Sequence, residues 1–374
     1  MSVPRPTRRR LLGGAGGLAA LALAGCVAER PTTEREIDPE NAYVGISMPT
    51  KSLERWNRDG ANLEKELQAL GYRTTLQYAD NRTDQQISQI QNMVTGDVDI
   101  VVIASIDGTV LGPVIEQAAA KGITVIAYDR LIEGSEAVDY YVTFDNFRVG
   151  QMQGEAIIEA LGMESEPGPF HLELFAGSPD DPNAAQFFGG TWDVLEPYFA
   201  DGRAISPSGK VPASAEEWTS IGILGWDSAK AQSEMQTRLN SFYADGTPLH
   251  AVLAPADSLA LGIEQAIEAR GYVPGQNWPF VTGQDADKAN VLNMLADKQG
   301  MTVFKDMREQ GKRAAIMCQS IIAGEEPEIT PDAGYNNGVK DVPTYLLEPQ
   351  SITKEDIPSV LVDSGFYTAD ELGL

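Results

Sequence analysis

Cysteine and histidine are scarce in this chain of 374 residues. It has two cysteines, Cys26 and Cys318, and two histidines, His171 and His250, all far apart in the sequence. A zinc site built from cysteine and histidine needs three or four such ligands at close spacing, so this class of site is excluded. The same shortage excludes a disulfide framework and a cysteine protease site of the papain type.

Basic residues are also few relative to acidic ones. Lys and Arg together number 28 against 54 Asp and Glu, which gives a formal net charge of −26. Nucleic-acid binding relies on clustered cations, so we expect no nucleic-acid partner. With 43% hydrophobic and 22% charged residues the chain can still bury a large core, and its length suits about two to three domains.

Glycine-rich nucleotide motifs and calcium loops are missing as well. The glycine-rich stretch 13–17 lies in an N-terminal apolar segment, and no Gly-x-Gly-x-x-Gly or Walker pattern opens a helix. The acidic groups Asp180-Asp181 and Asp285-Ala286-Asp287 lack the spaced ligands of a calcium loop. We therefore expect neither a cofactor nor a bound metal.

The N-terminus has the pattern of an export signal. Four arginines, Arg5, Arg8, Arg9 and Arg10, precede an apolar run of 15 residues, 11–25. A membrane-spanning helix needs about 20 apolar residues, so we interpret residues 1–25 as a signal peptide. The sequence of residues 7–12 is typical of a twin-arginine signal, and an arginine-rich general export signal is the open alternative.

Cys26 comes directly after the apolar run. Leu23-Ala24-Gly25-Cys26 resembles a bacterial lipobox, in which the cysteine is lipidated after cleavage; the alternative is an ordinary small apolar residue. We expect a lipoprotein anchored through Cys26 to the outer face of the bacterial cytoplasmic membrane, in the periplasm or at the cell surface. Residues 26–41 are polar, contain two prolines, and would form a flexible tether.

From residue 43 onward, short apolar segments alternate with longer amphipathic ones. The short segments are apolar throughout, which is typical of parallel strands buried on both faces. Strand–helix repeats with right-handed crossovers give an α/β fold with a doubly wound parallel sheet. The strands predicted in the first half span residues 43–48, 74–78, 100–104 and 124–128, and the helices span 53–70, 85–94 and 110–121.

The same alternation begins again in the second half. The predicted strands there span residues 170–175, 221–224, 251–254, 280–282 and 302–304, and the helices span 184–198, 229–243, 259–270 and 289–297. These are too many strands for one sheet, so we predict two doubly wound parallel-sheet lobes joined by a hinge, with a first crossing near residues 141–146. Cys318 lies in an apolar helical stretch and is expected to pack in a core.

The division into lobes follows from this pattern. We assign residues 42–145 plus about 306–338 to the N-terminal lobe, and residues 146–305 plus about 339–374 to the C-terminal lobe. Residues 327–347, rich in proline, glycine and asparagine, are interpreted as chain that runs back between the lobes.

Polar side chains follow most of the predicted strands. Ligands of open parallel sheets bind beyond the carboxyl ends of the strands, so two facing lobes bring these side chains to one cleft. A neutral polyol suits such a set, because each hydroxyl both donates and accepts hydrogen bonds and the apolar face of a sugar ring packs on an aromatic plane. The strand-end residues are Lys51, Arg55, Trp56, Asp129, Arg130, Asn183, Trp226, Asp257, Asp285 and Lys305.

A series of short motifs also occurs in order along the chain. They are Glu54-Arg55-Trp56, Ala127-Tyr128-Asp129-Arg130, Phe144-Asp145-Asn146, Gly177-Ser178-Pro179-Asp180-Asp181-Pro182-Asn183-Ala184, Gly283-Gln284-Asp285-Ala286-Asp287, Thr302-Val303-Phe304-Lys305 and Asn337-Gly338-Val339-Lys340-Asp341-Val342-Pro343. Their order and spacing resemble the periplasmic sugar-binding proteins of ABC transporters, of the ribose/galactose-binding type. The chain is most similar to the xylose-binding and multiple-monosaccharide-binding branch, over about residues 43–372.

The resemblance implies a type I periplasmic binding protein whose ligand is a monosaccharide such as xylose, glucose, galactose or arabinose. It implies sugar contacts from the first lobe by Lys51, Arg55, Trp56, Asp129 and Arg130, from the second lobe by Asn183, Trp226, Asp257 and Asp285, and at a crossing by Lys305. Ala256 stands where many relatives have asparagine, so Asp257 is expected to take a larger share of the binding.

The resemblance implies a binding protein and not an enzyme. Such a protein captures the sugar by hinge closure and delivers it to the permease of an ABC importer, and we expect a monomer. An exported carbohydrate-active enzyme is an alternative, because Asp129, Asp257 and Asp285 could supply paired carboxylates. A sugar sensor for a receptor or kinase is another, since it would use the same closed form.

Overall fold

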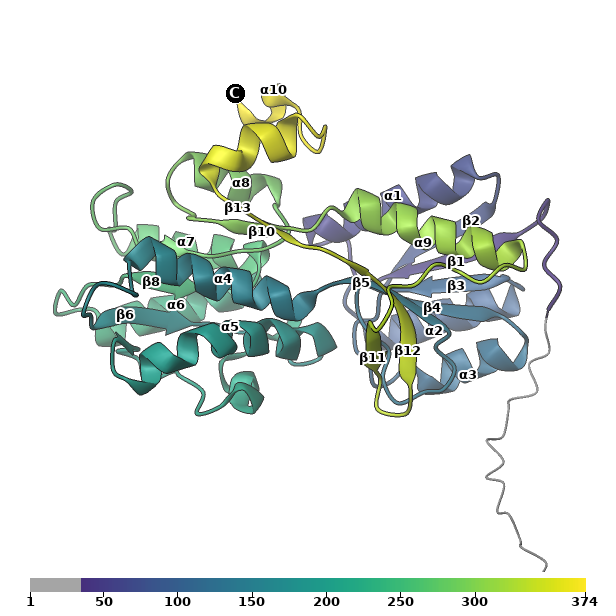
Figure 1. Ribbon diagram of the computed structural model, residues 1–374, viewed down its shortest axis with the longest axis horizontal. Coiled ribbons are helices and arrows are strands. Elements are labelled where there is room, and N and C mark those ends of the chain that lie inside the picture. Colours follow the sequence, from purple (N-terminus) through teal and green to yellow (C-terminus); the bar gives the residue numbers. More distant parts are fainter. Residues whose placement is uncertain (1–34) are drawn as a thin grey trace, which may run out of the picture. The chain divides into compact units, whose positions relative to one another are not determined.

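The computed structural model describes residues 35–374, which form two α/β lobes, each built on its own sheet (Figure 1). The first lobe has a seven-stranded sheet in the order β11-β12-β5-β4-β3-β1-β2. All neighbouring strands in it are parallel except β11 and β12. Its strands are β1 (Tyr43–Met48), β2 (Arg73–Tyr78), β3 (Ile100–Ile103), β4 (Thr124–Tyr128), β5 (Tyr140–Phe144), β11 (Gly334–Asn336) and β12 (Asp341–Leu347).

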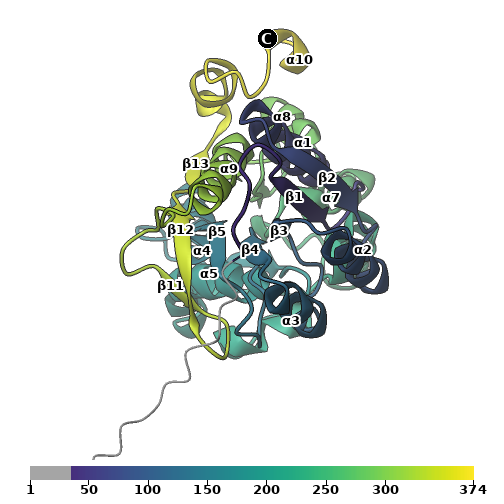
Figure 2. The same cartoon turned by 90° about the vertical axis from the view of Figure 1, so that its right-hand side faces the viewer.

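Helices cover both faces of this sheet (Figure 2). Helices α1 (Glu54–Ala69) and α9 (Met307–Ile322) pack on one face, and α2 (Thr83–Thr95) and α3 (Gly112–Ala120) pack on the other. In β3, Ile100 and Val102 face the first pair, whereas Val101 and Ile103 face the second. Burial on both sides explains why this strand is apolar at every position.

Cys318 lies in the core between α1, α9 and the sheet, as expected. It is completely buried, and burial raises the pKa of its thiol to about 12. The thiol is therefore a packing group rather than a reactive one.

The second lobe has a parallel sheet in the order β7-β6-β8-β9. Its strands are β6 (Phe170–Leu174), β7 (Ala204–Ile205), β8 (Ala251–Leu253) and β9 (Phe280–Val281). Its helices are α4 (Asn146–Leu161), α5 (Pro182–Ala200), α6 (Ser228–Phe242), α7 (Asp257–Ala269) and α8 (Lys288–Leu295). The predicted fold class, two parallel-sheet α/β lobes, is confirmed.

A small antiparallel sheet ties the end of the chain to the second lobe. Strand β10 (Thr302–Phe304) pairs with β13 (Gln350–Ile352), and a parallel bridge links Val303 of β10 to Gln284. Three short elements follow β13, namely a 3-10 helix (Lys354–Asp356), a π-helix (Ile357–Val362) and α10 (Ala369–Leu372).

One predicted strand, residues 221–224, is wrong. The structure has there the junction of two 3-10 helices, Ala215–Ile221 and Leu224–Trp226, and only Gly222 forms a bridge, to Ala176. Gly225 has a φ of 78° and turns the chain away from any sheet. Ile221 and Ile223 are buried in the core of the second lobe, so their apolar character reflects packing.

Three connections run between the lobes. They lie at Asp145 between β5 and α4, at Lys305 and Asp306 between β10 and α9, and at residues 348–349 between β12 and β13. The assignment of residues 339–374 to the second lobe therefore needs correction, as does the interpretation of residues 327–347 as connecting chain. Strand β12 pairs in register with β5 and buries Val342 in the first lobe, so the return begins only after it.

Residues 35–41, the described part of the expected tether, contact the first lobe. Within the described region, Arg35 forms an ion pair of 2.9 Å with Asp99 and donates to the carbonyl oxygens of Asp97 and Val98. Ile37 packs against the core of the first lobe. The chain is thus docked from Arg35 onward, while Cys26 and the expected signal peptide lie outside the described residues.

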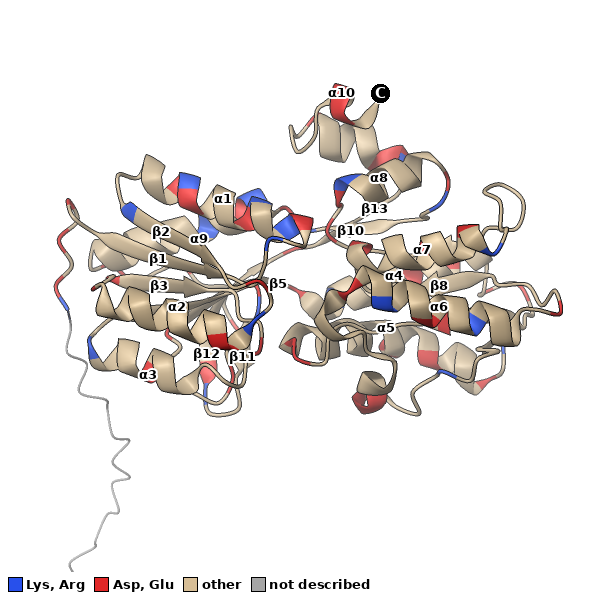
Figure 3. Ribbon diagram, turned by 180° about the vertical axis from the view of Figure 1, so that it is seen from behind, with Lys and Arg blue, Asp and Glu red and all other residues tan. Residues whose placement is uncertain are grey.

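Acidic residues lie on helices and loops of both lobes (Figure 3), so the excess negative charge is spread over the described residues. None of the helices within residues 35–374 combines the length and the apolar character needed to cross a membrane.

Glycines set the distance between α4 and α5. A Cβ atom added to Gly150 would lie 1.9 Å from the carbonyl oxygen of Phe187, and one added to Gly190 would lie 1.9 Å from that of Phe147. The two backbones can approach this closely only because both positions lack a side chain.

We predict that Gly150→Ala destabilises the protein by about 1–3 kcal/mol, because the helices must move apart. Gly112→Ala is the matched control, since a Cβ there meets nothing within 4 Å and alanine favours the helix. Urea denaturation of both variants measures the difference. Equal stability of the two variants would contradict the packing argument.

Glu264 is expected to make the free energy of unfolding depend on pH. This side chain is 2% exposed, its Oε1 has no hydrogen-bond partner among residues 35–374, and its Oε2 accepts from Asn293. Burial raises its pKa from 4.5 to about 8. Because the folded state holds this proton more tightly than the unfolded chain, the stabilisation is complete below pH 4.5 and is lost as the pH rises through about 8.

We therefore expect the substitution Glu264→Gln to remove the contribution of this carboxyl to the pH dependence of the free energy of unfolding. The Tm of the variant should fall less than that of the parent between about pH 6 and pH 9, as measured by calorimetry in matched buffers. Parallel curves for the two proteins would show that Glu264 does not titrate in this range.

Candidate functional site

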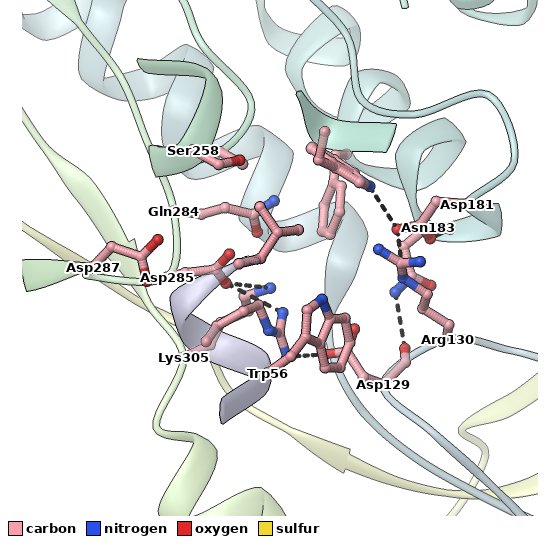
Figure 4. A pocket seen from close by; sticks show the side chains of 15 residues that line it. Trp56, Asp129, Arg130, Asp181, Asn183, Ser258, Gln284, Asp285, Asp287 and Lys305 are labelled. Atoms are coloured by element: carbon pink, nitrogen blue, oxygen red, sulfur yellow. Dashed lines mark hydrogen bonds and ion pairs between the residues drawn. The ribbon is translucent and has the colours of Figure 1, made fainter. Parts of the chain in front are cut away.

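A cavity lies between the lobes, where the carboxyl ends of strands from both sheets meet (Figure 4). About 400 Å³ of space, including the solvent at its mouth, is not filled by protein atoms. Its lining consists of Leu53, Arg55, Trp56, Asp129, Arg130, Asp181, Asn183, Phe187, Trp226, Ala256, Ser258, Gln284, Asp285, Asp287 and Lys305.

Arg55 is the central cation of the site. Its Nε and Nη2 donate to Oδ2 of Asp59 at 3.1 and 3.0 Å, Nη2 donates to Oδ2 of Asp129 at 2.7 Å, and Nη1 donates to Oδ1 of Asp285 at 3.3 Å. Asp59 lies one turn further along α1, Asp129 follows β4, and Asp285 belongs to the second lobe. The planar guanidinium thus connects three carboxylates from two lobes.

Asp129 directly follows β4 in a left-handed conformation with a φ of 60°. Its backbone carbonyl accepts hydrogen bonds from Nδ2 of Asn183 at 2.8 Å, the hydroxyl of Tyr141 at 2.6 Å and Oγ1 of Thr143 at 2.9 Å. These bonds hold the residue in a conformation that is costly for aspartate. Burial favours the neutral carboxyl, but Arg55 and its neighbouring cations outweigh burial and lower the pKa of Asp129, so its carboxylate is an ionised acceptor.

A second group of acids comes from the loop after β9. Asp285 lies 2.9 Å from Nζ of Lys305 as well as 3.3 Å from Arg55. Burial, together with the nearby charge of Asp285, raises the pKa of Asp287 to about 8. Near neutral pH the site therefore offers a protonated carboxyl at Asp287, which can donate a hydrogen bond, beside the ionised Asp129.

Asp181 organises the opposite side of the cavity. Its Oδ2 lies 2.8 Å from Nε of Arg130 and accepts a hydrogen bond from Nε1 of Trp226 at 3.0 Å. Its Oδ1 accepts from the backbone nitrogen of Asn183 and so caps α5. Burial raises the pKa of Asp181, an effect that Arg130 opposes.

Aromatic rings bound the cavity from both lobes. Trp56 of the first lobe is buried, with the guanidinium groups of Arg55 and Arg130 at 4.3 and 5.2 Å from its ring centre. In the second lobe Phe187 and Trp226 meet edge to face at 6.2 Å. A Cβ at Gly177 would lie 2.2 Å from the Trp226 ring, so this glycine makes room for the indole.

Three polar side-chain atoms of lining residues have no hydrogen-bond partner among residues 35–374. They are Nε1 of Trp56 and Nε of Arg130, both donors, and Oε1 of Gln284, an acceptor. Of these, Nε of Arg130 still lies at ion-pair distance from Asp181. Leaving such groups buried and unpaired costs free energy, so a ligand that pairs with them is favoured.

Eight of the ten residues singled out in the sequence line the cavity, and two do not. Lys51 is exposed, with Nζ at 4.9 Å from the ring centre of Tyr78. Asp257 is completely buried and turns away from the cavity to accept hydrogen bonds from Gln299, Thr302 and the backbone nitrogen of Asp287. The structure thus does not bring these two side chains to the cavity, and Ala256, not Asp257, reaches the lining.

Several lining residues were missed from the sequence. Asp181, Gln284 and Asp287 stand inside the sequence motifs quoted above, within two residues of predicted contacts. Phe187 is one helical turn beyond Asn183 on α5, and that spacing was a usable signal. The other missed residues are Leu53, Ala256 and Ser258.

The site can hold a compact ligand that is polar at its edges and apolar on its faces. Its cations are already paired with carboxylates, so a neutral guest leaves this balance intact. Within residues 35–374 no group of three or more His, Cys, Asp or Glu side chains is placed to hold a metal ion.

Comparisons with known proteins agree with this geometry. A family model described as a periplasmic binding protein domain matches residues 44–326. The multiple sugar-binding periplasmic receptor ChvE of Rhizobium radiobacter is 46% identical over 334 residues, covering 89% of this chain and 93% of that protein. The D-xylose-binding periplasmic protein of Escherichia coli K12 is 34% identical over 329 residues, covering 88% of this chain and 92% of that protein.

A solved structure is similar along almost its whole length. An ABC transporter solute-binding protein from Clostridium phytofermentans, with bound β-D-glucose, is 48% identical and has a TM-score of 0.84; the match covers 88% of this chain and 99% of that one. With the family model matched over most of the described residues and relatives this similar, the chain belongs to the periplasmic binding protein family.

Proposed function

We propose that this protein captures a monosaccharide between its two lobes, without changing it chemically, and delivers it to an ABC importer. The observation that carries the proposal is the cavity itself, in which indole rings from both lobes and mutually paired charges surround one small space. The relatives support the ligand class, since their names specify multiple sugars and D-xylose, and the similar structure holds β-D-glucose. Glucose, xylose, galactose and arabinose are the candidates.

The residues of the site have complementary roles toward such a sugar. The C–H faces of the ring pack on Trp56 and on the Phe187–Trp226 pair. Hydroxyl groups donate to Asp129 and accept from Arg130 and from the indole Nε1 of Trp56. Because these protein groups are buried, a sugar that lacks one hydroxyl leaves its partner unpaired and binds less tightly.

Closure of the lobes would complete the site. Arg55 of the first lobe contacts Asp285 of the second at 3.3 Å, and Asn183 of the second lobe donates to the carbonyl of Asp129 in the first at 2.8 Å. A ligand that touches both lobes favours the closed form, in which these bonds can form. The closed form is then the one that the permease recognises.

The location follows from the same proposal. The relatives are named as periplasmic proteins, and the N-terminal sequence resembles that of an exported lipoprotein with Cys26 as its lipid-bearing residue. The protein would act as a monomer on the outer face of the cytoplasmic membrane. Its other protein partner would be the permease, and a sensor receptor could use the same closed form.

Sugar binding is tested by calorimetry on the purified protein with glucose, xylose, galactose, arabinose and ribose. We predict binding of at least one of the first four. Trp56→Ala should weaken it by about tenfold or more, through loss of the ring contact. Trp56→Phe keeps a ring but loses the free Nε1 donor, and should weaken it by about fivefold.

Trp278→Phe is the matched control, because Nε1 of Trp278 donates to the carbonyl of Lys298 and the residue does not line the cavity. It should bind the sugar like the parent protein. Failure of every sugar to bind would contradict the proposed function, and equal losses in the variants at positions 56 and 278 would contradict the site.

Absence of catalysis is a separate prediction. Incubation with nitrophenyl β-glucoside and β-xyloside should release no nitrophenol above the buffer rate, and bound sugar should be recovered unchanged by chromatography. The carboxylates of Asp129, Asp181 and Asp285 each already pair with a cation, which suits them to hold hydroxyls. Turnover that disappears in Asp129→Asn would instead indicate a glycosidase.

A further inference from the structure

The C-terminal segment, residues 350–374, lies outside the cavity but packs against its walls. Its apolar side chains form a hydrophobic cluster of their own with α8 and the start of α9, built from Ala286, Val291, Met294, Phe304, Met307, Ile352, Ile357, Leu361, Phe366, Tyr367 and Leu372. Figure 1 shows the segment in yellow beside α8. Through β13 and α8 it belongs to the second lobe.

Tyr367 supports the loop that carries two acids of the site. Its side chain is 2% exposed and its hydroxyl donates to the carbonyl oxygen of Ala286 at 2.9 Å. Ala286 stands between Asp285 and Asp287, which both line the cavity. Asp285 and Ala286 have φ values of 98° and 52°, and such left-handed conformations persist only where surrounding contacts hold them.

Phe366 supports the cation of the same group. Its ring meets that of Phe304 edge to face at 4.9 Å. Phe304 directly precedes Lys305, whose Nζ lies 2.9 Å from Asp285. The C-terminal segment thus lies behind both partners of the Asp285–Lys305 ion pair.

The first lobe also contacts this segment. Arg308 at the start of α9 lies 5.1 Å from the ring centre of Phe366 and donates to Ser364, and Arg58 of α1 contacts both rings. The guanidinium of Arg58 lies 4.4 Å from the ring centre of Tyr367 and 4.8 Å from that of Phe366. Arg58 also pairs with Glu54 at 2.8 Å, and its side chain is 27% exposed. It belongs to α1, the helix that carries Arg55 and Trp56, so this contact joins the two lobes at a point that the ligand does not reach.

We propose that the C-terminal segment is an external latch for the sugar site, in which Tyr367 braces the 285–287 loop of the second lobe and offers its ring to Arg58 of the first. The inference rests on the proposed function, because it concerns the affinity of that site. Opening of the lobes would move α1 away from the segment, so the cation–π contact stabilises only the closed form. The latch then slows release of a ligand that it never touches.

The chain supplies a closely matched control contact. Arg313 on α9 lies 5.0 Å from the ring centre of Tyr345 on β12, and it pairs with Glu309 four residues earlier, as Arg58 pairs with Glu54. Both partners of this second contact belong to the first lobe. Loss of this contact removes a cation–π contact and an ion pair of the same kind, but it does not affect closure of the lobes.

The test compares Arg58→Met, Tyr367→Phe and Arg313→Met with the parent protein, using whichever sugar of the panel binds. Surface plasmon resonance gives the rate constants, and thermal unfolding checks that each variant is folded. We expect Arg58→Met and Tyr367→Phe to raise the Kd by roughly threefold to tenfold, chiefly through faster dissociation. Arg313→Met should stay within about twofold of the parent.

Equal dissociation rates for Arg58→Met and Arg313→Met would overturn the latch, whereas failure of the parent to bind any sugar would overturn the proposed function. Fluorescence energy transfer between dyes on the two lobes gives the same comparison without sugar. The Arg58→Met protein should then show a larger separation of the lobes than the Arg313→Met protein. Identical distance distributions in the two variants would also refute the latch.

Discussion

The ion pairs of Arg55 with three carboxylates are the interaction on which the rest of the site depends. A buried guanidinium is stable only when carboxylates surround it, and here Asp59, Asp129 and Asp285 do so from two lobes. Burial and the charge of Asp129 act on Asp59 in the same direction and raise its pKa to about 6, while Arg55 keeps Asp129 ionised. Arg55 therefore keeps Asp129 ionised, whereas at Asp59 burial outweighs the effect of the same cation.

This arrangement explains how a charged site can suit a neutral guest. The acceptor oxygens of Asp129 and Asp181 are held in place by Arg55 and Arg130 before any ligand arrives. Orienting them costs little when the sugar binds, because the protein has already met that cost in folding. The indole rings add apolar contact area for the sugar. Only Nε1 of Trp226 takes up one of these acceptor oxygens, because it donates to Asp181.

Much of the fold was readable from the sequence because parallel strands buried on both faces are apolar throughout, as β3 is. The strand-end rule located most of the site, since it depends only on where each strand stops. The rule did not locate residues for which the direction of the side chain determines whether it lines the cavity. Lys51 is near the end of β1 but lies over Tyr78, and Asp257 begins α7 but turns toward Gln299, which is distant in sequence. Residues 221–224 were predicted as a strand because a short apolar run occurs both in buried strands and in irregular segments that pack in a core.

The buried thiol of Cys318 has a practical consequence. With its pKa raised to about 12, it stays in the unreactive thiol form in neutral solution. A cysteine introduced at an exposed position, such as Leu224 at 52% exposure and two residues before the lining residue Trp226, would therefore react with a maleimide dye long before Cys318 does. Labelled in this way, the protein could report the arrival of its guest as a change in fluorescence, and the fold itself would protect the internal sulfur from the chemistry of the label.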